Sequence, residues 1–289
     1  MMEAPSNKVV SSRVLGPDVV QIEFESPFIA KKRLPGQFVI IRVDERGERI
    51  PLTIADSDPV KGTVTVIVQG VGRSTKELNA LPVGSRVLDL VGPLGKATHL
   101  LQKGTVACVG GGIGTAVIYP IVKALHGAET HVIAIIGARN KGLLILEDQL
   151  RSLASEFYVT TDDGSHGRKG FVSDQLTDCI KAGLAGGRKI DEVIAIGPVP
   201  MMRAVCNVTR PFGVKTVVSL NSIMVDGTGM CGGCRASVGG EMKFVCVDGP
   251  EFDGHAVDFD ELTLRLQTYR EDEQRALKDW VEHHAVSRS

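Results

Sequence analysis

A charge-free, glycine-rich segment at residues 105–122 constrains the fold of this chain more than any other feature. Its length reaches the roughly 18 residues at which an apolar segment becomes a candidate membrane helix. Four glycines interrupt it: Gly110, Gly111, Gly112 and Gly114. Pro120 follows them, so the segment predicts a buried strand, a tight glycine turn and the start of a helix instead of a membrane span. Such a unit is the building block of a parallel α/β sheet.

The hydrophobic periodicity differs on the two sides of about residue 100. Before it, short β-type runs are separated by turn residues at 9–15, 19–26, 37–43, 63–70 and 85–92. These runs predict an antiparallel barrel or sandwich. After it, strand candidates alternate with helix candidates, including a helix over residues 143–156, which predicts parallel βαβ units.

We therefore divide the chain into four parts. Residues 1–99 form the antiparallel unit, 100–215 the α/β domain, 216–258 a cysteine-bearing domain and 259–289 a charged helical tail. In the tail, the apolar residues that are expected to form a docking stripe are Leu264, Leu266, Tyr269, Leu277 and Trp280.

Charge and the N-terminal sequence restrict the partners. The chain has 33 Lys and Arg against 34 Asp and Glu, a formal charge of −1, so no global field attracts a nucleic-acid backbone. Residues 1–12 lack the basic start and apolar core of a secretory signal. We expect a cytoplasmic protein with neither a nucleic-acid nor a membrane partner.

A cysteine-rich loop carries the strongest chemical signal. Asp226 is followed by Cys231 and Cys234 in the spacing D-x4-C-x2-C, and Cys246 follows after eleven further residues. Plant-type [2Fe-2S] sites use C-x4-C-x2-C and a distant fourth cysteine, because a glycine-rich loop must fold around the cluster. A carboxylate can ligate iron, so Asp226 and three thiolates would complete the ligand set. Two alternatives stay open: zinc held by the cysteines and a ligand such as His255, or Asp226 capping a turn with water as fourth ligand.

The glycine turn of the first paragraph is the second signal. It lets backbone amides at a helix N-terminus approach a pyrophosphate. Its spacing is not a clean G-x-G-x-x-G, because Thr115 stands where a third glycine or alanine is expected. Gly197, Pro198 and the methionines Met201 and Met202 follow a later strand, where open α/β sheets place ligands. A ligand-free turn and plain core methionines are the alternatives.

The third signal lies in the antiparallel half. Arg49, Pro51 and Thr53, with hydroxyl residues at 74 and 75, can hold an anionic diphosphate and a flat ring. Ordinary turn and edge-strand residues are the alternative. Farther on, the Asp162–Asp163–Gly164 sequence is either a simple turn or a carboxylate near a ribose hydroxyl, and Arg139 is either an exposed arginine or a contact for a 2′-phosphate.

The three motifs, in this order and over nearly the whole chain, resemble the ferredoxin–NADP reductase-like flavoprotein superfamily. The chain is most similar to electron-transfer subunits with FAD and one [2Fe-2S] cluster. These are the subunit of dihydroorotate dehydrogenase and the small subunit of NADH-dependent reduced ferredoxin:NADP oxidoreductase, also described as a sulfide dehydrogenase subunit. The resemblance implies an N-terminal antiparallel flavin-binding β-barrel, a Rossmann-like parallel-sheet nucleotide domain and a small C-terminal iron–sulfur domain with a helical tail.

The resemblance also assigns site residues. The FAD-binding residues that it implies are Arg49, Ile50, Pro51, Leu52, Thr53, Ile67, Val68, Gln69, Gly72, Ser74 and Thr75. The NAD(H)-binding residues are Gly110, Gly111, Gly112, Ile113, Gly114, Thr115, Arg139, Asp163, Gly197, Pro198 and Met201. The cluster ligands are Asp226, Cys231, Cys234 and Cys246.

The first cluster ligand distinguishes two branches of this family. Dihydroorotate-type subunits have four cysteines, whereas Asp226 in the first position resembles the transhydrogenase-type small subunit. The resemblance then implies an enzyme that moves electrons between NAD(H), FAD and a [2Fe-2S] cluster. Its partner would be a larger iron–sulfur flavoprotein subunit, in a heterodimer or higher assembly that bifurcates electrons. The alternatives are a subunit serving dihydroorotate oxidation and a zinc-stabilised module without catalysis.

Overall fold

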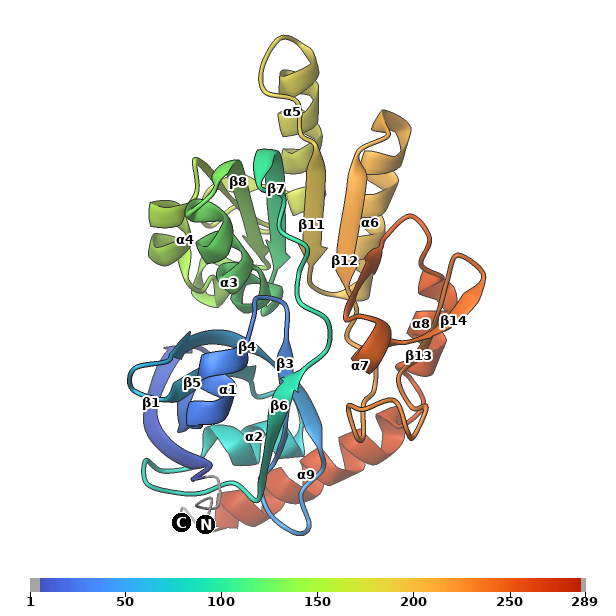
Figure 1. Ribbon diagram of the computed structural model, residues 1–289. Coiled ribbons are helices and arrows are strands. Elements are labelled where there is room, and N and C mark those ends of the chain that lie inside the picture. Colours follow the sequence, from blue (N-terminus) through green and yellow to red (C-terminus); the bar gives the residue numbers. More distant parts are fainter. Residues whose placement is uncertain (1–5, 287–289) are drawn as a thin grey trace.

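The N-terminal half is an antiparallel barrel, as the alternating runs predict. The computed structural model describes residues 6–286, and Figure 1 shows the barrel below the second half of the chain. The strand order is β1 (Lys8–Gly16), β2 (Val19–Glu25), β5 (Thr63–Gln69), β4 (Ile50–Asp58), β3 (Phe38–Arg42) and β6 (Asp89–Leu94). The two edges meet because residues 84–87 pair with the start of β1, for example through the Val9 amide and the Ser85 carbonyl at 2.8 Å.

Alternation along β3 separates the inside of the barrel from its outer face. Val39 and Ile41 are fully buried in the barrel core. Phe38 and Ile40 point the other way and belong to a core shared with the C-terminal half. Two short helices, α1 (Pro27–Lys32) and α2 (Arg73–Asn79), pack against β5. The outer face of β3 is therefore an interface with later parts of the chain.

The second half is built on a seven-stranded sheet. Its order is β10 (Arg168–Lys169), β9 (Glu156–Thr161), β8 (Glu129–Ala138), β7 (Lys103–Gly111), β11 (Glu192–Ile196), β12 (Lys215–Ser219) and β15 (Glu251–Asp253). All neighbours are parallel except β12 and β15. The strand order reverses next to β7, which is where such sheets place ligands.

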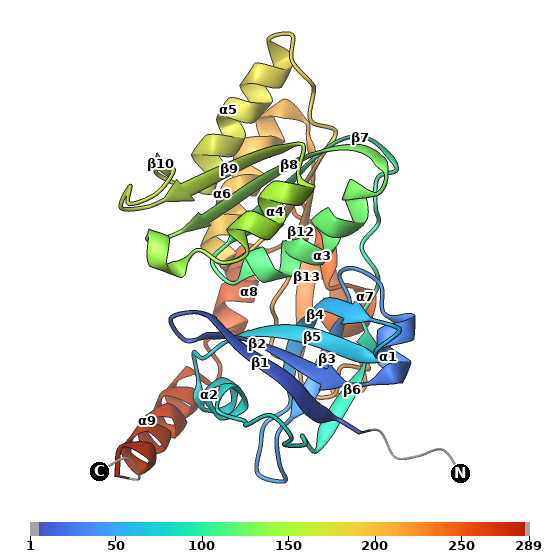
Figure 2. The ribbon, with the colours of Figure 1, turned by 90° about the vertical axis from the view of Figure 1, so that its left-hand side faces the viewer.

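Helices cover both faces of this sheet (Figures 1 and 2). On one face, α3 (Gly114–His126) and α4 (Glu147–Leu153) bury Ile118, Leu125 and Leu150 against β7 and β8. On the other, α5 (Val172–Leu184) and α6 (Val199–Thr209) bury Leu176 and Met202. Short 3-10 turns, η1 (Lys141–Leu143) and η2 (Arg210–Phe212), complete the loops. The predicted Rossmann-like layer order is confirmed.

One helix is shorter than predicted. The pattern over 143–156 predicts a continuous helix, but α4 begins only at Glu147 and ends at Leu153. Ile145 and Leu146 are buried in the core under α3 and α4, and Leu146 adopts a left-handed φ of 56°. Burial of these two side chains outweighs their helix propensity, so the chain reaches α4 through a turn.

The cysteine-bearing segment consists of short elements attached to both halves. It contains the hairpin β13 (Arg235–Val238) and β14 (Glu241–Phe244), the single turn α7 (Val245–Asp248) and β15. The tail is two helices instead of one, α8 (Phe259–Arg265) and α9 (Arg270–Val286). Asp258 caps α8 by accepting from the amides of Asp260 and Glu261.

The predicted stripe on the tail is divided by the break between α8 and α9. Leu264 and Tyr269 are exposed, whereas Leu266, Leu277 and Trp280 are half-buried. Helix α9 lies against α2 of the barrel. Within residues 6–286, no helix is both long enough and apolar enough to cross a membrane.

Candidate functional site

A cavity of about 680 Å³ lies where the carboxyl ends of the parallel strands face the barrel. Val19 and Gln69 contribute its barrel wall. The sheet side is lined by Gly111, Gly112, Ile113, Gly137, Ala138, Arg139, Leu143, Ile145, Thr160, Asp162, Phe171, Val172, Ser173, Pro198, Pro200, Met201 and Ala204. The cavity is large and mostly apolar with a few polar groups, which is typical of cofactor sites.

Three helices begin at the wall of this cavity. Gly112 and Ile113 precede α3, Val172 and Ser173 open α5, and Pro198 precedes α6. The first amides of each helix have no partner within the helix, and the helix dipole favours negative charge there. The cavity therefore suits an anionic pyrophosphate more than a neutral ligand.

Each glycine of the turn has a separate structural reason. A Cβ on Gly114 would collide with the carbonyl oxygen of Ile196 and lie 2.9 Å from the Gly197 Cα, so α3 can approach β11 only with glycine there. Gly112 has a φ of 55° and nothing within 4 Å of an added Cβ, so its backbone faces open space. The turn thus serves helix packing at Gly114 and leaves room for a ligand at Gly112.

The predicted nucleotide residues divide into two groups. Those that line the cavity are Gly111, Gly112, Ile113, Arg139, Pro198 and Met201. The others, which lie outside its lining, are Gly110, Gly114, Thr115, Asp163 and Gly197. Asp163 accepts from the Ser165 amide at 2.9 Å in a turn, whereas its neighbour Asp162 lines the cavity. Met202 is fully buried core, as the alternative interpretation held.

Sequence reasoning missed the cavity residues at the ends of β8 and β9 and at the start of α5. Gly137, Ala138 and Thr160 end or nearly end their strands, and Phe171 and Ser173 flank the first residue of α5. The carboxyl ends of all parallel strands meet at one edge of the sheet. The residues that end each predicted strand could therefore have been included as candidates for the site.

The predicted flavin residues surround β4 and the start of α2. The Arg49 guanidinium lies 3.4 Å from the Asp89 carboxylate, and its side chain is 45% exposed. The Thr75 hydroxyl accepts from the Gly72 amide at 3.0 Å, and the Ser74 hydroxyl donates to the Glu48 carboxylate. The Arg49 side chain is thus open to solvent, whereas Ser74 is buried and Thr75 belongs to the capping box of α2.

The remaining predicted flavin residues contribute backbone or apolar contacts. Ile67 and Val68 are buried, so only their main chain is available to a ligand. Gln69 alone among the predicted flavin residues also lines the large cavity. Ile50, Pro51, Leu52 and Thr53 form the first residues of β4 and are half-buried. In register, Pro51 pairs with Ile40 and Thr53 with Phe38.

The cysteine loop packs on this same outer face of the barrel. A Cβ on Gly227 would lie 2.8 Å from Leu94 Cδ1 and 2.9 Å from Ile40 Cγ1. Gly227 directly follows Asp226, and Ile40 is the register partner of Pro51. Strand β3 alone therefore separates the loop that carries Asp226 from the candidate flavin strand β4.

Two of the four predicted cluster ligands are already together. The Sγ atoms of Cys234 and Cys246 are 3.2 Å apart and buried. Burial and the neighbouring Cys234 thiol raise the pKa of Cys246 to about 12, so a metal must displace its proton. Cys231 is exposed, and within residues 6–286 no three acidic, histidine or cysteine side chains converge on a single point.

Asp226 is hydrogen-bonded to the loop that carries the cysteines. Its carboxylate accepts from the Thr228 amide at 2.8 Å and from the Cys231 amide at 2.7 Å. These bonds, that from Thr228 first, lower its pKa and keep it ionised. The donor set of one carboxylate and three thiols on a glycine-rich loop fits a [2Fe-2S] cluster.

His255, the proposed fourth ligand of the zinc alternative, is bonded elsewhere in the structure. The His255 Nε2 is 2.9 Å from the Thr209 hydroxyl at the end of α6. Thr209 in turn accepts from the Thr216 hydroxyl at 2.6 Å. The half-buried imidazole is thus bonded to one of two linked, buried threonines, and it does not lie with the cysteines.

Comparison with known proteins agrees with this site. Residues 221–258 match the model of the iron–sulfur cluster binding domain of dihydroorotate dehydrogenase B. A Thermotoga maritima protein named as a homolog of the dihydroorotate dehydrogenase B (NAD(+)) electron transfer subunit is 46% identical over 268 residues, 93% of each chain. The electron transfer subunit of that enzyme from Fusobacterium nucleatum is 32% identical, over 81% of this chain and 91% of the relative.

Two solved structures resemble this chain, one over nearly its whole length and one in the fold alone. A chain from the structure of NADH-dependent reduced ferredoxin-NADP oxidoreductase, studied for flavin-based electron bifurcation, is 44% identical with a TM-score of 0.89. The match covers 97% of this chain and 100% of that one. A cytochrome P450 reductase from Amycolatopsis, 20% identical with a TM-score of 0.60, covers 71% of this chain and 64% of its own and shares the fold.

Proposed function

The chain belongs to the family of dihydroorotate dehydrogenase B electron-transfer subunits and their homologues, and from that premise we propose that it moves electrons between NAD(H), FAD and a [2Fe-2S] cluster. We further propose that it acts as the smaller subunit of a flavin-bifurcating NADH-dependent ferredoxin:NADP oxidoreductase. The observation that carries the proposal is the seating of the Asp226–Gly227 backbone against Ile40, the register partner of Pro51.

The residues have separate tasks in this function. Bound FAD would supply the redox chemistry, because a flavin takes up two electrons together and can pass them on singly. The Arg49 guanidinium and the hydroxyls of Ser74 and Thr75 would bind the flavin diphosphate. The outer edge of β4 at Pro51 and Thr53 would support the flat ring.

On the other side of the cavity, the amides at Gly112 and Ile113 would bind the NAD(H) pyrophosphate at the start of α3. The nicotinamide would then face the barrel wall, where Val19 and Gln69 line the same cavity. Asp226, Cys231, Cys234 and Cys246 would hold the cluster, and the short path across Ile40 would connect it to the flavin strand.

Two features favour the bifurcating branch over dihydroorotate oxidation. The first is Asp226 at the first ligand position, hydrogen-bonded within the loop. The second is the match to the chain from the NADH-dependent reduced ferredoxin-NADP oxidoreductase structure, which is 44% identical over 97% of this chain and 100% of that one. The Fusobacterium nucleatum dihydroorotate dehydrogenase subunit is 32% identical, and the 46% identical Thermotoga maritima protein is named only as a homolog of such subunits. The dihydroorotate branch remains the second candidate because the named family members belong to it.

Anaerobic native purification tests the proposal. We expect a co-purifying large iron–sulfur flavoprotein, identified by mass spectrometry. In this chain, once separated from that partner, we expect FAD, iron and acid-labile sulfide in a ratio of about one flavin to two irons, without zinc. A dihydroorotate dehydrogenase subunit as the bound partner would move the chain to the second candidate. Zinc without sulfide would refute the electron-transfer function.

A further inference from the structure

We propose that Lys123 and Asp56 form a latch that fixes the nucleotide-binding half of the chain against the flavin barrel at the separation that hydride transfer requires. Both are positioning residues, because neither lines the cavity. The inference rests on the proposed function, and it assigns a role to an ion pair outside the cofactor sites.

Contacts within the barrel hold Asp56 in place independently of Lys123. The Arg33 guanidinium donates to the Asp56 Oδ1 at 3.1 Å and to the Ser57 hydroxyl at 2.7 Å, and the Arg33 side chain is only 12% exposed. The Ser57 amide also donates to Asp56 Oδ1 at 2.8 Å. Two hydrogen bonds from within the barrel therefore hold this carboxylate, and the bond from Arg33 to Ser57 fixes the guanidinium that donates one of them.

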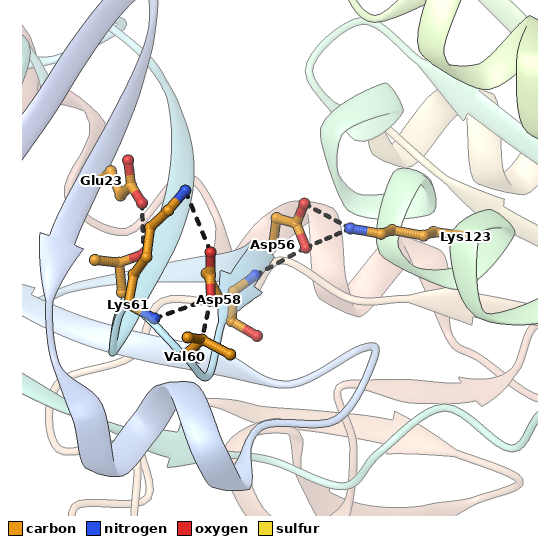
Figure 3. Close-up of polar contacts among 8 residues, drawn as sticks. Glu23, Asp56, Asp58, Val60, Lys61 and Lys123 are labelled. Atoms are coloured by element: carbon orange, nitrogen blue, oxygen red, sulfur yellow. Dashed lines mark hydrogen bonds and ion pairs between the residues drawn. The ribbon is translucent and has the colours of Figure 1, made fainter.

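Lys123 completes the contact from the other half. Its Nζ donates to both carboxylate oxygens of Asp56, at 2.9 and 2.8 Å, and Figure 3 shows it reaching from α3 across to β4. Among the ion pairs of residues 6–286, this is the one that joins residues 1–99 to residues 100–215. Buried apolar residues of α3 also share one core cluster with the barrel residues Val19, Ala55 and Ile67.

The position of Lys123 on α3 connects the latch to the cofactor site. The helix begins at the glycine turn, and Lys123 lies nine residues after Gly114, about 14 Å along the axis at 1.5 Å per residue. Apolar packing alone tolerates sliding, because it has no direction. A bidentate ion pair near the C-terminal end of α3 is directional. It therefore fixes the position of α3, and of the glycine turn at its start, relative to β4. β4 carries both ends of this arrangement, Pro51 near its start and Asp56 near its end.

The exposure of the pair sets the size of the effect. The side chains of Lys123 and Asp56 are 46% and 30% exposed, so their attraction is partly screened. Exposed pairs of this kind change an equilibrium by at most about fivefold. We therefore expect Lys123→Met to lower the rate of FAD reduction by NADH two- to fivefold, with a smaller change in the Kd of NADH.

Charge reversal gives the sharper test. Lys123→Glu places a second carboxylate beside Asp56, so the rate should fall below that of Lys123→Met at low salt and rise toward it as salt screens the repulsion. The wild-type rate should instead fall with salt toward that of Lys123→Met. The rates are measured by anaerobic stopped-flow absorbance on the FAD-loaded protein.

Lys61 provides matched controls. It pairs with Asp58 at 3.3 Å on the same strand β4, but that pair lies wholly within the barrel (Figure 3). Lys61→Met and Lys61→Glu should keep the wild-type rate and its salt dependence. If the Lys61 variants lower the rate as the Lys123 variants do, the effect is one of general surface charge and the latch is refuted.

A second readout does not depend on the cofactors. A zero-length carbodiimide cross-linker should join the Lys123 amine to the Asp56 carboxylate in the flavin-free chain, with a yield that falls as salt rises, detected as a linked peptide by mass spectrometry. A cross-link together with an unchanged rate in Lys123→Glu would reduce the pair to a structural contact and overturn the proposal. A wild-type protein that NADH cannot reduce would overturn the proposed function itself, and the cross-link would still report whether the contact forms.

Discussion

Asp226 is the residue at which the cluster assignment is tested most directly. Asp226→Cys supplies a fourth thiolate, so we expect a retained two-iron cluster with a changed visible and electron paramagnetic resonance spectrum. Cys234→Ala removes a buried candidate ligand that lies beside Cys246, and the cluster should be lost. A wild-type spectrum in Cys234→Ala would refute the ligand assignment.

Glu251 introduces a pH dependence into stability. Its side chain accepts from the Thr98 hydroxyl at 2.6 Å, and burial raises its pKa from 4.5 to about 7. The folded protein therefore binds a proton that the unfolded chain has released between these pH values, so stability falls as pH rises through this window. The free energy of unfolding should decrease by about 1.4 kcal/mol for each pH unit crossed inside the window, and so by roughly a few kcal/mol between about pH 5 and 8.

The control for this prediction is Glu251→Gln, which keeps the shape and the acceptor for Thr98 but does not titrate. Thermal unfolding midpoints measured at both pH values should then differ less than in the wild type. An equal pH dependence in the variant would assign the effect to another group.

We expect Asp162 to determine the preference for NADH over NADPH. The Asp162 carboxylate directly follows β9 and would repel a 2′-phosphate, while Arg139, which follows the neighbouring strand β8, would attract it. We expect the wild type to prefer NADH, and Asp162→Asn to raise kcat/KM for NADPH relative to NADH by about tenfold. Asp163→Asn is the matched control, because that carboxylate accepts from Ser165 in a turn, and the preference should stay unchanged.

At the scale of the element, α3 depends on one glycine. Gly114→Ala introduces a methyl group into the carbonyl oxygen of Ile196, so we expect a loss of about 3 kcal/mol or more and much weaker NADH binding. Gly127→Ala at the other end of α3 has an ordinary φ of −82° and free space, and it should change stability by less than about 1 kcal/mol. Chemical denaturation of both variants distinguishes a local packing requirement from general helix sensitivity.

Elements with a local signal could be predicted from the sequence, and those made by distant pairing could not. The strand β7, the glycine turn and α3 follow from a contiguous pattern. β15 has only three residues, and it exists because Val218 and Phe252 pair across more than thirty positions of sequence. The barrel closure by residues 84–87 has the same cause.

The candidate site divides in the same way. The glycines, Pro198 and Met201 could be found because each follows a strand in the sequence. Phe171 and Asp162 could not be chosen over their neighbours, because only the turn geometry after β9 decides which side chain faces the cavity. The proximity of Gly227 to Ile40 is a purely three-dimensional fact.

At the scale of the whole molecule, the surface around the cluster loop should determine association with the larger subunit. Val225, Met230 and Val247 are exposed apolar residues of this loop and of α7, and Met230 is 89% exposed. Met230→Glu should weaken the heterodimer at least tenfold in Kd, because it buries a charge in the interface. The FAD and iron content should be unchanged. Analytical ultracentrifugation with the purified partner measures the effect, and an unchanged Kd would place the interface elsewhere.

The attachment of the cysteine-bearing segment to two separate bodies has a consequence for biogenesis. Its strand β15 needs β12 as a template, and its loop at Gly227 needs the finished wall of β3 and β6. Each surface forms with its own domain, so the segment can be fully seated only after both earlier domains have folded. Maturation should therefore proceed in a fixed order. The barrel and the α/β domain fold first, and the iron–sulfur assembly machinery inserts the cluster afterwards. A chain in which either earlier domain is misfolded should then fail to take up the cluster.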